Sequence, residues 1–277
     1  MGVARLHRRA IEKPWGRCDL PNWWVDSPGM RVGEIWFETQ EGATDELLIK
    51  YLFTSEKLSI QVHPDDELAG LQGLARGKDE AWIVLKAEDT ANIGLGLREH
   101  VDKQTLREAA LNGSIEQLLS WHCVSAGDFY YSPAGTIHAI GPGLTLIEVQ
   151  QNTDITYRLY DYGRPRELHV DMAVAAVHPY PYQSPCRIEQ HGNGRTILVH
   201  GVKFVVERWK GPHSIFFARA EEPMWIIPIA GVVHVERDSI HAGDVGLLDV
   251  ECHLRTSQDS DLLIAYPGSK VRKCAKS

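Results

Sequence analysis

The chain has 277 residues and a mass of 31.1 kDa, and its 43% hydrophobic and 24% charged residues are ordinary globular composition, which excludes disorder or a fibrous repeat as a description of the whole chain. Acidic residues outnumber basic ones by 37 to 29, so we expect no nucleic-acid partner, and an anionic substrate would need a local basic pocket. No apolar run reaches the ~20 residues of a membrane helix, the first sixteen residues show no secretory signal, and the five cysteines form no C-x-x-C pair, so we expect a cytoplasmic protein with no membrane contact.

Strand-like segments dominate the chain, since runs rich in Val, Ile and aromatic residues alternate with Gly, Pro, Asp or Ser. Only Asp102–Trp121 has the apolar spacing of a helix, and Gly113 predicts its division into two short helices. Many short strands with few helices favour a β-sandwich or a β-barrel. In chain order, the predicted strands are Val32–Thr39, Glu46–Thr54, Ala81–Ala87, Leu144–Gln150, Thr156–Tyr162, Thr196–Trp209, Met224–Val235 and Leu262–Tyr266.

A proline-rich stretch divides the sequence into two parts. The seven residues from Pro179 to Pro185 include three prolines, which is typical of a linker. The residues that follow again have the pattern of strands. We therefore predict two β-domains in series, residues 1–180 with a short helical insert near 102–121, and residues 181–277.

The first candidate motif is Leu58–Asp66, which reads L-S-I-Q-V-H-P-D-D. If it is a strand, Ser59, Gln61 and His63 lie on one face because side chains alternate along a strand. Three polar side chains on a core-facing strand would be unusual and indicate a site. The alternative is that this face lies in solvent and that His63 begins a turn.

The second candidate motif is Gly77–Trp82, where Lys78 and Glu80 share a face by the same period of two. Glu80 could serve as a carboxylate ligand of a metal, with Lys78 as a neighbouring positive charge. A solvated turn is the alternative interpretation.

The third candidate motif places His138 at the end of P-x-G-x-x-H, a turn into a strand that presents one imidazole. Preceded by Gly127-Asp128, it resembles the second half of a cupin-type signature. Gln61, His63 and Glu80 are available as partners from earlier strands. Two imidazoles, one carboxylate and one amide suit a borderline divalent ion such as zinc.

The fourth candidate motif runs from Leu146 to Tyr162. Glu148, Asp154 and Arg158 are evenly spaced and could share one face, which would bring two acids and a guanidinium together. A buried structural ion pair between Asp154 and Arg158 is the alternative.

Taken together, these motifs resemble the type I phosphomannose isomerases. The resemblance covers roughly residues 11–180 in order and rests on S-I-Q-x-H-P-D-D, K-x-E-x-W, G-T-I-H-A-I and E-x-Q-Q-x-T-D-x-T-Y-R-x-Y-D-Y, with K-P-W-G at Lys13 and G-E-I-W at Gly33. It implies a mainly β fold of two cupin-type β-barrels (jelly rolls) in tandem, with a short helical segment in the first and no metal site in the second. It is similar to the compact bacterial form of the family.

The resemblance also implies roles for individual residues. The family pattern implies one zinc ion per chain, and it implies catalytic and substrate- or phosphate-binding groups around that ion. The metal ligands would be Gln61, His63, Glu80 and His138; the catalytic group Arg158, Asp154, Glu148 and Lys78; and the substrate- or phosphate-binding residues Ser59, Lys50 and Lys78.

The reaction implied is the interconversion of mannose 6-phosphate and fructose 6-phosphate, with a phosphosugar as partner and a monomer or homodimer as the assembly. Moving a proton between C2 and C1 through a cis-enediol needs a base and stabilisation of the developing charge. Arg158 does not titrate at neutral pH, so we assign it charge stabilisation, while the base stays open between Glu148, Asp154 and a metal-bound hydroxide.

Two other classes of function remain open at this stage. A metal-dependent cupin oxygenase would use two histidines and one carboxylate, and a non-catalytic sugar-binding cupin would keep the fold without needing the metal set. In the C-terminal part no set of ligands accompanies the histidines, so we interpret His234, His241 and His253 as structural or surface residues.

Overall fold

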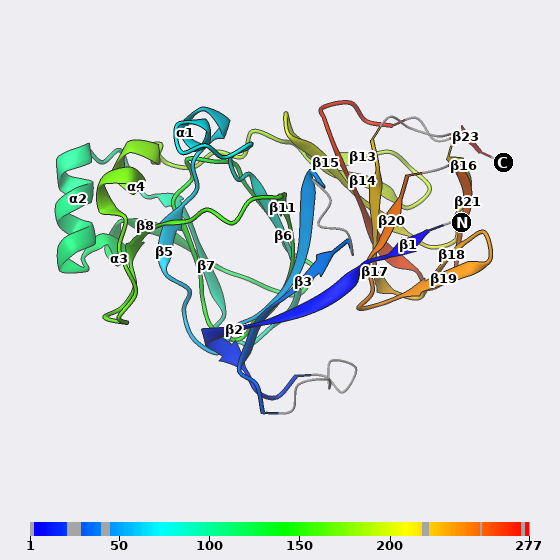
Figure 1. The fold of residues 1–277 in the computed structure, drawn as a ribbon, viewed down its shortest axis with the longest axis horizontal. Helices are drawn as coiled ribbons and strands as arrows, with labels where there is room; N and C mark the ends of the chain where they lie inside the picture. The colour runs from blue at the N-terminus through cyan, green and yellow to red at the C-terminus, as the bar shows by residue number, and fades with distance from the viewer. Residues whose placement is uncertain are drawn as a thin grey trace. The chain divides into compact units, whose positions relative to one another are not determined.

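The computed structural model describes residues 3–20, 29–39, 45–217, 222–249, 251–272 and 275–276. Antiparallel β-sheets are the main secondary structure of this part, accompanied by four α-helices (Figure 1), so the prediction of a mainly β protein is confirmed. No helix in these ranges is long and apolar enough to cross a membrane. The chain divides into two compact units, a larger one of Ala10–Trp36 and Lys50–Ser184 and a smaller one of Met1–Arg9, Phe37–Ile49 and Pro185–Ser277. The domain boundary near residue 180 stays a prediction.

Two open sheets build most of the larger unit, and neither closes into a barrel within the described residues. The five-stranded sheet has the order β12 (Tyr157–Tyr160), β5 (Ile60–Val62), β10 (His138–Ile140), β7 (Asn92–Leu97) and β8 (Leu119–Cys123). The six-stranded sheet has the order β2 (His7–Arg17), β3 (Val32–Glu38), β4 (Leu47–Phe53), β11 (Leu144–Gln151), β6 (Glu80–Ala87) and β9 (Phe129–Ser132).

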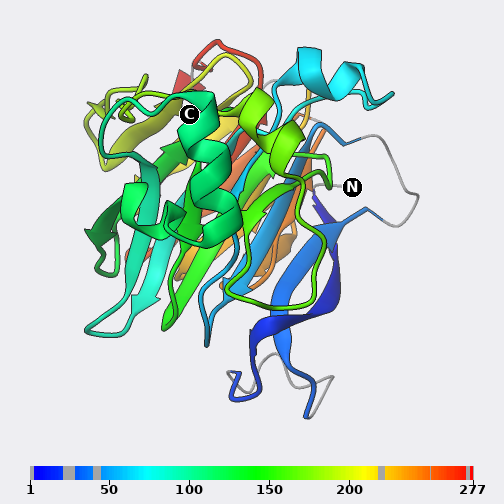
Figure 2. The same cartoon turned by 90° about the vertical axis from the view of Figure 1, so that its left-hand side faces the viewer.

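The two faces of the five-stranded sheet have different neighbours. Ile60, Val62 and Ala139 point to one face and pack against α2 (Lys103–Asn112), α3 (Ile115–Leu118) and α4 (Val170–Ala176), which cover the sheet in Figure 2. On the opposite face, Ile93, Leu95 and Ile140 form a core with Trp82, Leu144 and Leu146 of the six-stranded sheet. Residues between these positions, such as Gln61, therefore face the space between the sheets.

The predicted helical segment is confirmed as two helices, α2 and α3, the second of which ends at Leu118. Asp102 caps α2 by accepting hydrogen bonds from the backbone of Gln104 and Thr105, and Gly113 ends the helix in the left-handed region at φ 83°. The prediction was wrong at the end of the segment, because Leu119 begins strand β8 and pairs with Leu97 of β7. Helices α1 (Asp66–Gly70) and α4 were not predicted; α1 has only five residues.

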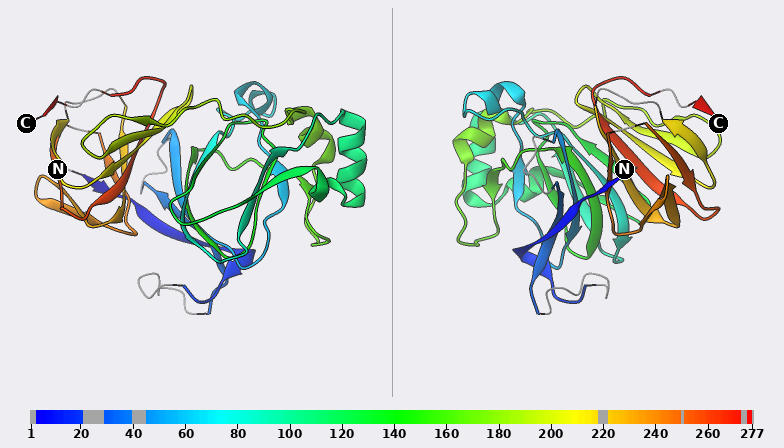
Figure 3. Two further views of the ribbon diagram at one scale, coloured as in Figure 1. Left: turned by 180° about the vertical axis from the view of Figure 1, so that it is seen from behind. Right: turned by 45° about the vertical axis from the view of Figure 1, so that its right-hand side comes forward.

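The smaller unit contains two further open sheets (Figure 3) around a core that includes Trp209, Ile226 and Ile264. Two predicted strands are each divided in the structure. A turn at 201–203 interrupts the predicted strand Thr196–Trp209, and Gly231, at φ 70°, interrupts the predicted strand Met224–Val235. One sheet has the order β1 (Ala4–Arg5), β20 (Gly246–Leu248), β17 (Met224–Ala230), β22 (Asp261–Pro267), β15 (Phe204–Lys210), β14 (Arg195–His200) and β13 (Glu189–Gln190). The other has the order β19 (Asp238–His241), β18 (Val232–Val235), β21 (Cys252–Thr256), β16 (Ser214–Phe217) and β23 (Ala275–Lys276).

Candidate active site

The predicted ligand residues come together from both sheets of the larger unit. Gln61 on β5 and His138 on β10 lie directly opposite each other in the five-stranded sheet. Glu80 is the first residue of β6 in the six-stranded sheet, and His63 follows β5 by one residue. The site is therefore assembled between the two sheets, on the face that carries no helices.

The connection between β5 and β6 has its two ends tied together. The backbone N–H of Lys78 donates to Pro64 O at 3.0 Å, and the N–H of Gly77 donates to Asp66 Oδ1 at 2.7 Å. A Cβ at Gly77 would lie 2.4 Å from the backbone carbon of Asp65, so only glycine allows this close approach. The crossing brings Lys78 and Glu80 next to His63.

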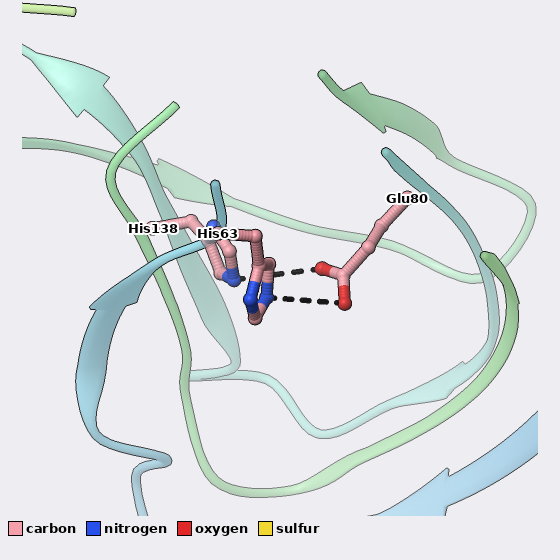
Figure 4. A group of neighbouring side chains, drawn as sticks. All are labelled: His63, Glu80 and His138. Carbon is pink, nitrogen blue, oxygen red and sulfur yellow. Dashed lines mark ion pairs between the residues drawn. The ribbon is translucent and has the colours of Figure 1, made fainter. Parts of the chain in front are cut away.

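His63, Glu80 and His138 form a buried group whose side chains converge (Figure 4), with candidate ligand atoms within 4.8 Å of one another. Nε2 of His63 lies 3.2 Å from Glu80 Oε1, and Nε2 of His138 lies 3.5 Å from Glu80 Oε2. The three residues are 1–2% exposed. Two imidazoles and a carboxylate at such spacing are a donor set typical of a divalent transition metal.

The hydrogen bonds of the imidazoles leave acceptor atoms facing each other. Nδ1 of His63 lies 2.8 Å from Ile155 O, and Nδ1 of His138 lies 3.0 Å from Thr136 O; carbonyls only accept, so each Nδ1 carries the proton and each Nε2 presents its lone pair to Glu80. Burial lowers the pKa of His63 to about 3 and also lowers the pKa of His138, so both rings are neutral at pH 7.

An ion would satisfy the atoms left without partners in this group. Nε2 of His63 and Oε2 of Glu80 are buried and make no hydrogen bond with the described residues. Unsatisfied buried polar atoms are costly and rare. A cation between the two acceptors would remove this cost, so the donor set fits a bound metal.

Gln61 completes the row of polar side chains beside His138. Its Nε2 lies 3.2 Å from Nε2 of His138, and its Oε1 accepts a hydrogen bond from Ser59 Oγ at 3.0 Å. Ser59 is buried. The structure thus places Gln61 and Ser59 in the site, while the role of Gln61 as a fourth ligand stays a prediction.

Two buried lysines each pair with a buried carboxylate. Lys78 Nζ lies 2.9 Å from Glu80 Oε1, and Lys50 Nζ lies 3.2 Å from Glu148 Oε1, while Glu148 Oε2 accepts from Trp82 Nε1 at 2.9 Å. Burial alone would lower the pKa of Lys78, but Glu80 and Glu148 raise it above its ordinary value, so Lys78 is a cation. Burial and the charge of Glu80 raise the pKa of Glu148.

Most of these residues line a pocket within the larger unit. Its lining brings together all the sequence-predicted site residues except His63, whose Nε2 lies 3.2 Å from Glu80 of the lining. The charged side chains around the pocket are Lys13, Glu34, Lys50, Lys78, Glu80, Glu148, Asp154, Arg158 and Arg166.

Glu148, Asp154 and Arg158 line the pocket together but do not share one face of a strand. Glu148 is on β11 of the six-stranded sheet, Arg158 is on β12 of the five-stranded sheet opposite Gln61, and Asp154 lies in the connection between them. The prediction that the three residues share one face was therefore wrong, because the chain passes from one sheet to the other within the motif. Among the described residues, Asp154 is exposed and forms no ion pair with Arg158, so the alternative of a buried structural pair is wrong.

Three charged residues of the pocket had no role in the sequence-based prediction. Glu34 accepts a hydrogen bond from Trp36 Nε1 at 2.6 Å and lies 3.4 Å from Lys13 Nζ. Lys50 and Lys13 lower the pKa of Glu34 although burial opposes them. Arg166 is the third. Lys13 and Glu34 belong to the K-P-W-G and G-E-I-W segments, and the family resemblance of those segments could have indicated that the two residues belong to the site. No sequence motif or residue spacing indicates Arg166.

Comparison with known proteins identifies the family. No protein-family model matches the chain. A mannose-6-phosphate isomerase of Streptococcus mutans is 33% identical over 234 residues, which cover 78% of this chain and 74% of that protein. The chain belongs to the mannose-6-phosphate isomerase family. Mannose-6-phosphate isomerase ManA of Bacillus subtilis is 38% identical over 162 residues, 54% of this chain and 51% of that protein.

Solved structures of the mannose-6-phosphate isomerase family have the same fold. A mannose 6-phosphate isomerase from Bacillus subtilis superposes with a TM-score of 0.84 and 27% identity, covering 96% of this chain and 99% of that one. A variant of phosphomannose isomerase from Salmonella typhimurium gives a TM-score of 0.76 at 15% identity, covering 97% of this chain and all of that one, which supports the fold alone. The family resemblance inferred from the sequence motifs is confirmed.

Proposed function

We propose that the protein interconverts mannose 6-phosphate and fructose 6-phosphate as an aldose–ketose isomerase. The observation that carries the proposal is the buried group of His63, Glu80 and His138, two of which line a charged pocket, in a chain of the mannose-6-phosphate isomerase family. The substrate is a phosphosugar, and we propose a cytoplasmic monomer or homodimer with no nucleic-acid or membrane partner.

We further propose that each chain binds one Zn²⁺ through Gln61, His63, Glu80 and His138. Neutral imidazoles and a carboxylate are suitable ligand types, and the facing acceptors of His63 and Glu80 support a cation there. Gln61 would bind through its amide oxygen, which here accepts from Ser59, so its amide group would have to turn. When bound, the ion supplies a Lewis acid that polarises sugar oxygens and stabilises developing negative charge.

The proton transfer between C2 and C1 needs a group that accepts a proton and returns it. Glu148 is the best-placed carboxylate of the pocket, because burial and Glu80 raise its pKa toward the working pH. Trp82 and Lys50 hold its two oxygens in place. Asp154, at the exposed side of the pocket, is the second carboxylate within the proposed catalytic group.

We propose different roles for the lysines and for the arginines of the pocket. Lys78 and Lys50 are each paired with a buried carboxylate, so we propose that they orient sugar hydroxyls together with Ser59. Among the described residues, the guanidinium of Arg158 donates only to the backbone carbonyl of Glu167, at 2.8 Å, and its Nε is buried without a partner there. We propose that Arg158 stabilises charge in the transition state and that the neighbouring Arg166 extends a cationic wall toward the phosphate.

At the level of architecture, we propose that the open sheets correspond to two cupin-type jelly rolls in tandem, with the metal site in a domain of residues 1–180 and none in residues 181–277. The support is the pairing of two antiparallel sheets around a core in each unit. In the smaller unit, His234 and His253 bond to Ser239 and Ser214.

The deciding experiment measures metal content and steady-state isomerisation of mannose 6-phosphate, before and after chelation. We expect one zinc ion per chain, activity that disappears on chelation, and activity that returns with zinc. A metal-loaded protein that consumes oxygen would identify an oxygenase. A protein that binds the sugar phosphate without turnover would identify a sugar-binding cupin, and either result would overturn the proposal.

A further inference from the structure

A buried aspartate lies between two arginines beside the pocket. Asp161 follows β12 and is 2% exposed. Nε and Nη2 of Arg166 donate to its two oxygens at 2.6 and 2.7 Å, and Nη2 of Arg164 lies 2.8 Å from Oδ1. A two-pronged arginine–carboxylate contact of this kind fixes the plane of the guanidinium.

The two arginines differ in what else holds them. Arg164 also donates to the backbone carbonyl of Lys57 at 2.7 Å, so it is anchored to a second segment. Arg166 has Asp161 as its only side-chain partner among the described residues, and it lines the pocket. The orientation of Arg166 therefore depends on Asp161.

The turn that brings these groups together uses left-handed backbone. Tyr162 and Gly163 have φ values of 54° and 80°, and the N–H of Arg164 donates to Asp161 O at 3.0 Å. Positive φ is unfavourable for tyrosine, so the surrounding contacts hold this conformation. The turn returns the chain so that Arg166, five residues after Asp161, reaches the carboxylate.

The charges of this cluster do not balance. Arg158, Arg164 and Arg166 carry three positive charges against two carboxylates, Asp161 and Glu56, whose Oε2 lies 3.8 Å from Nη1 of Arg164, so positive charge is in excess. Burial lowers the pKa of Arg158, and the charges of Arg166 and Arg164 lower it further. A phosphate monoester carries a charge of about −1.5 to −2 at pH 7, which is opposite in sign to this excess.

We propose that Asp161 is a positioning residue that holds the Arg166 guanidinium at the wall of the pocket, ready to bind the phosphate group of the substrate. The inference rests on the proposed function, because it takes the ligand to be a phosphosugar. Without Asp161, the flexible Arg166 side chain would have to be ordered when the substrate binds, and this would weaken binding without changing the chemical step.

The test compares Asp161→Asn, Arg166→Ala and the double variant in the zinc-loaded protein, with kcat, KM, melting temperature and the affinity for inorganic phosphate measured on each. For Asp161→Asn we expect KM and the phosphate dissociation constant to rise about fivefold to tenfold, the cost of ordering one long side chain, with kcat nearly unchanged. The double variant should bind no more weakly than Arg166→Ala, because Asp161 acts through Arg166.

A matched control is Asp171→Asn, which removes an exposed aspartate paired with Arg107 at 2.9 Å away from the pocket and should change none of these values. If Asp161→Asn does not fold, Arg166→Lys provides the test, since lysine keeps the charge but cannot make both bonds, and the same rise in KM is expected. An unchanged KM, or effects of Asp161 and Arg166 that add, would overturn the inference. A wild-type protein without isomerase activity would refute the proposed function instead, and the affinities for inorganic phosphate would still decide the role of Asp161.

Discussion

Gln61 and His138 occupy directly opposed positions on β5 and β10, and their side-chain nitrogens lie 3.2 Å apart. Opposed residues of neighbouring strands point to the same face, so the pairing register of these two strands sets the spacing of two of the proposed ligands. A slip of one residue would move His138 to the face covered by the helices. The register of the five-stranded sheet is therefore a requirement of the site.

We expect His138→Ala and Glu80→Ala each to lose the metal and nearly all activity while the fold survives. Removing one ligand weakens the proposed four-residue site steeply, whereas the cores of both units consist of apolar residues that do not contact the metal. Metal analysis, circular dichroism and turnover on one preparation test this. Stoichiometric zinc with normal turnover in either variant would show that the ligand assignment is wrong.

Arg158→Ala should keep its zinc and lose about 10²–10³ in kcat, the usual effect of removing one donor that meets charge in the transition state. Its guanidinium lies at the pocket and has no carboxylate partner among the described residues, so a large loss of stability is not expected. Zinc content, melting temperature and kcat are measured together. A variant that melts early but turns over normally per folded molecule would refute the catalytic role.

Lys50→Met should destabilise the fold by about 3–5 kcal/mol, because it leaves the buried Glu148 carboxylate without its cation. The two side chains are 4% and 6% exposed. The double variant Lys50→Met, Glu148→Leu should regain much of that stability, since it removes both charges. Urea unfolding of the single and double variants measures the coupling, and simple addition of the two effects would contradict the prediction.

The metal-free protein should lose stability as the pH falls below about 6.5. The folded state holds the pKa of His63 at about 3, below its ordinary value of 6.5, so the unfolded state takes up a proton first. The contribution is fully present above pH 6.5 and is lost as the pH falls toward 3, at up to about 1.4 kcal/mol per pH unit. Unfolding curves after chelation measure it, with His63→Gln as the control that should flatten the dependence.

The strands that carry the proposed ligands could be recognised because each motif is short and its alternation is local. Ser59, Gln61 and the turn before His138 follow the period of two, and Gly113 ends its helix where expected. The distribution of Glu148 and Arg158 over two sheets was not predictable, because a change of sheet depends on tertiary packing and leaves no mark in the spacing of residues. Asp161 and Arg166 were missed for the same reason, since a turn with Tyr162 in the left-handed region has no sequence signal.

Gly77 packs against Pro64 and Asp65, so the two ends of the loop between His63 and Glu80 lie together whatever the length of the loop. His63 and Glu80 are seventeen positions apart, yet the two ends of the segment between them are joined by direct backbone and side-chain hydrogen bonds. Its tip is open to solvent, with Leu71 80% exposed. We therefore expect substitutions and short insertions at the exposed positions around Leu71 to leave the spacing of His63 and Glu80 unchanged.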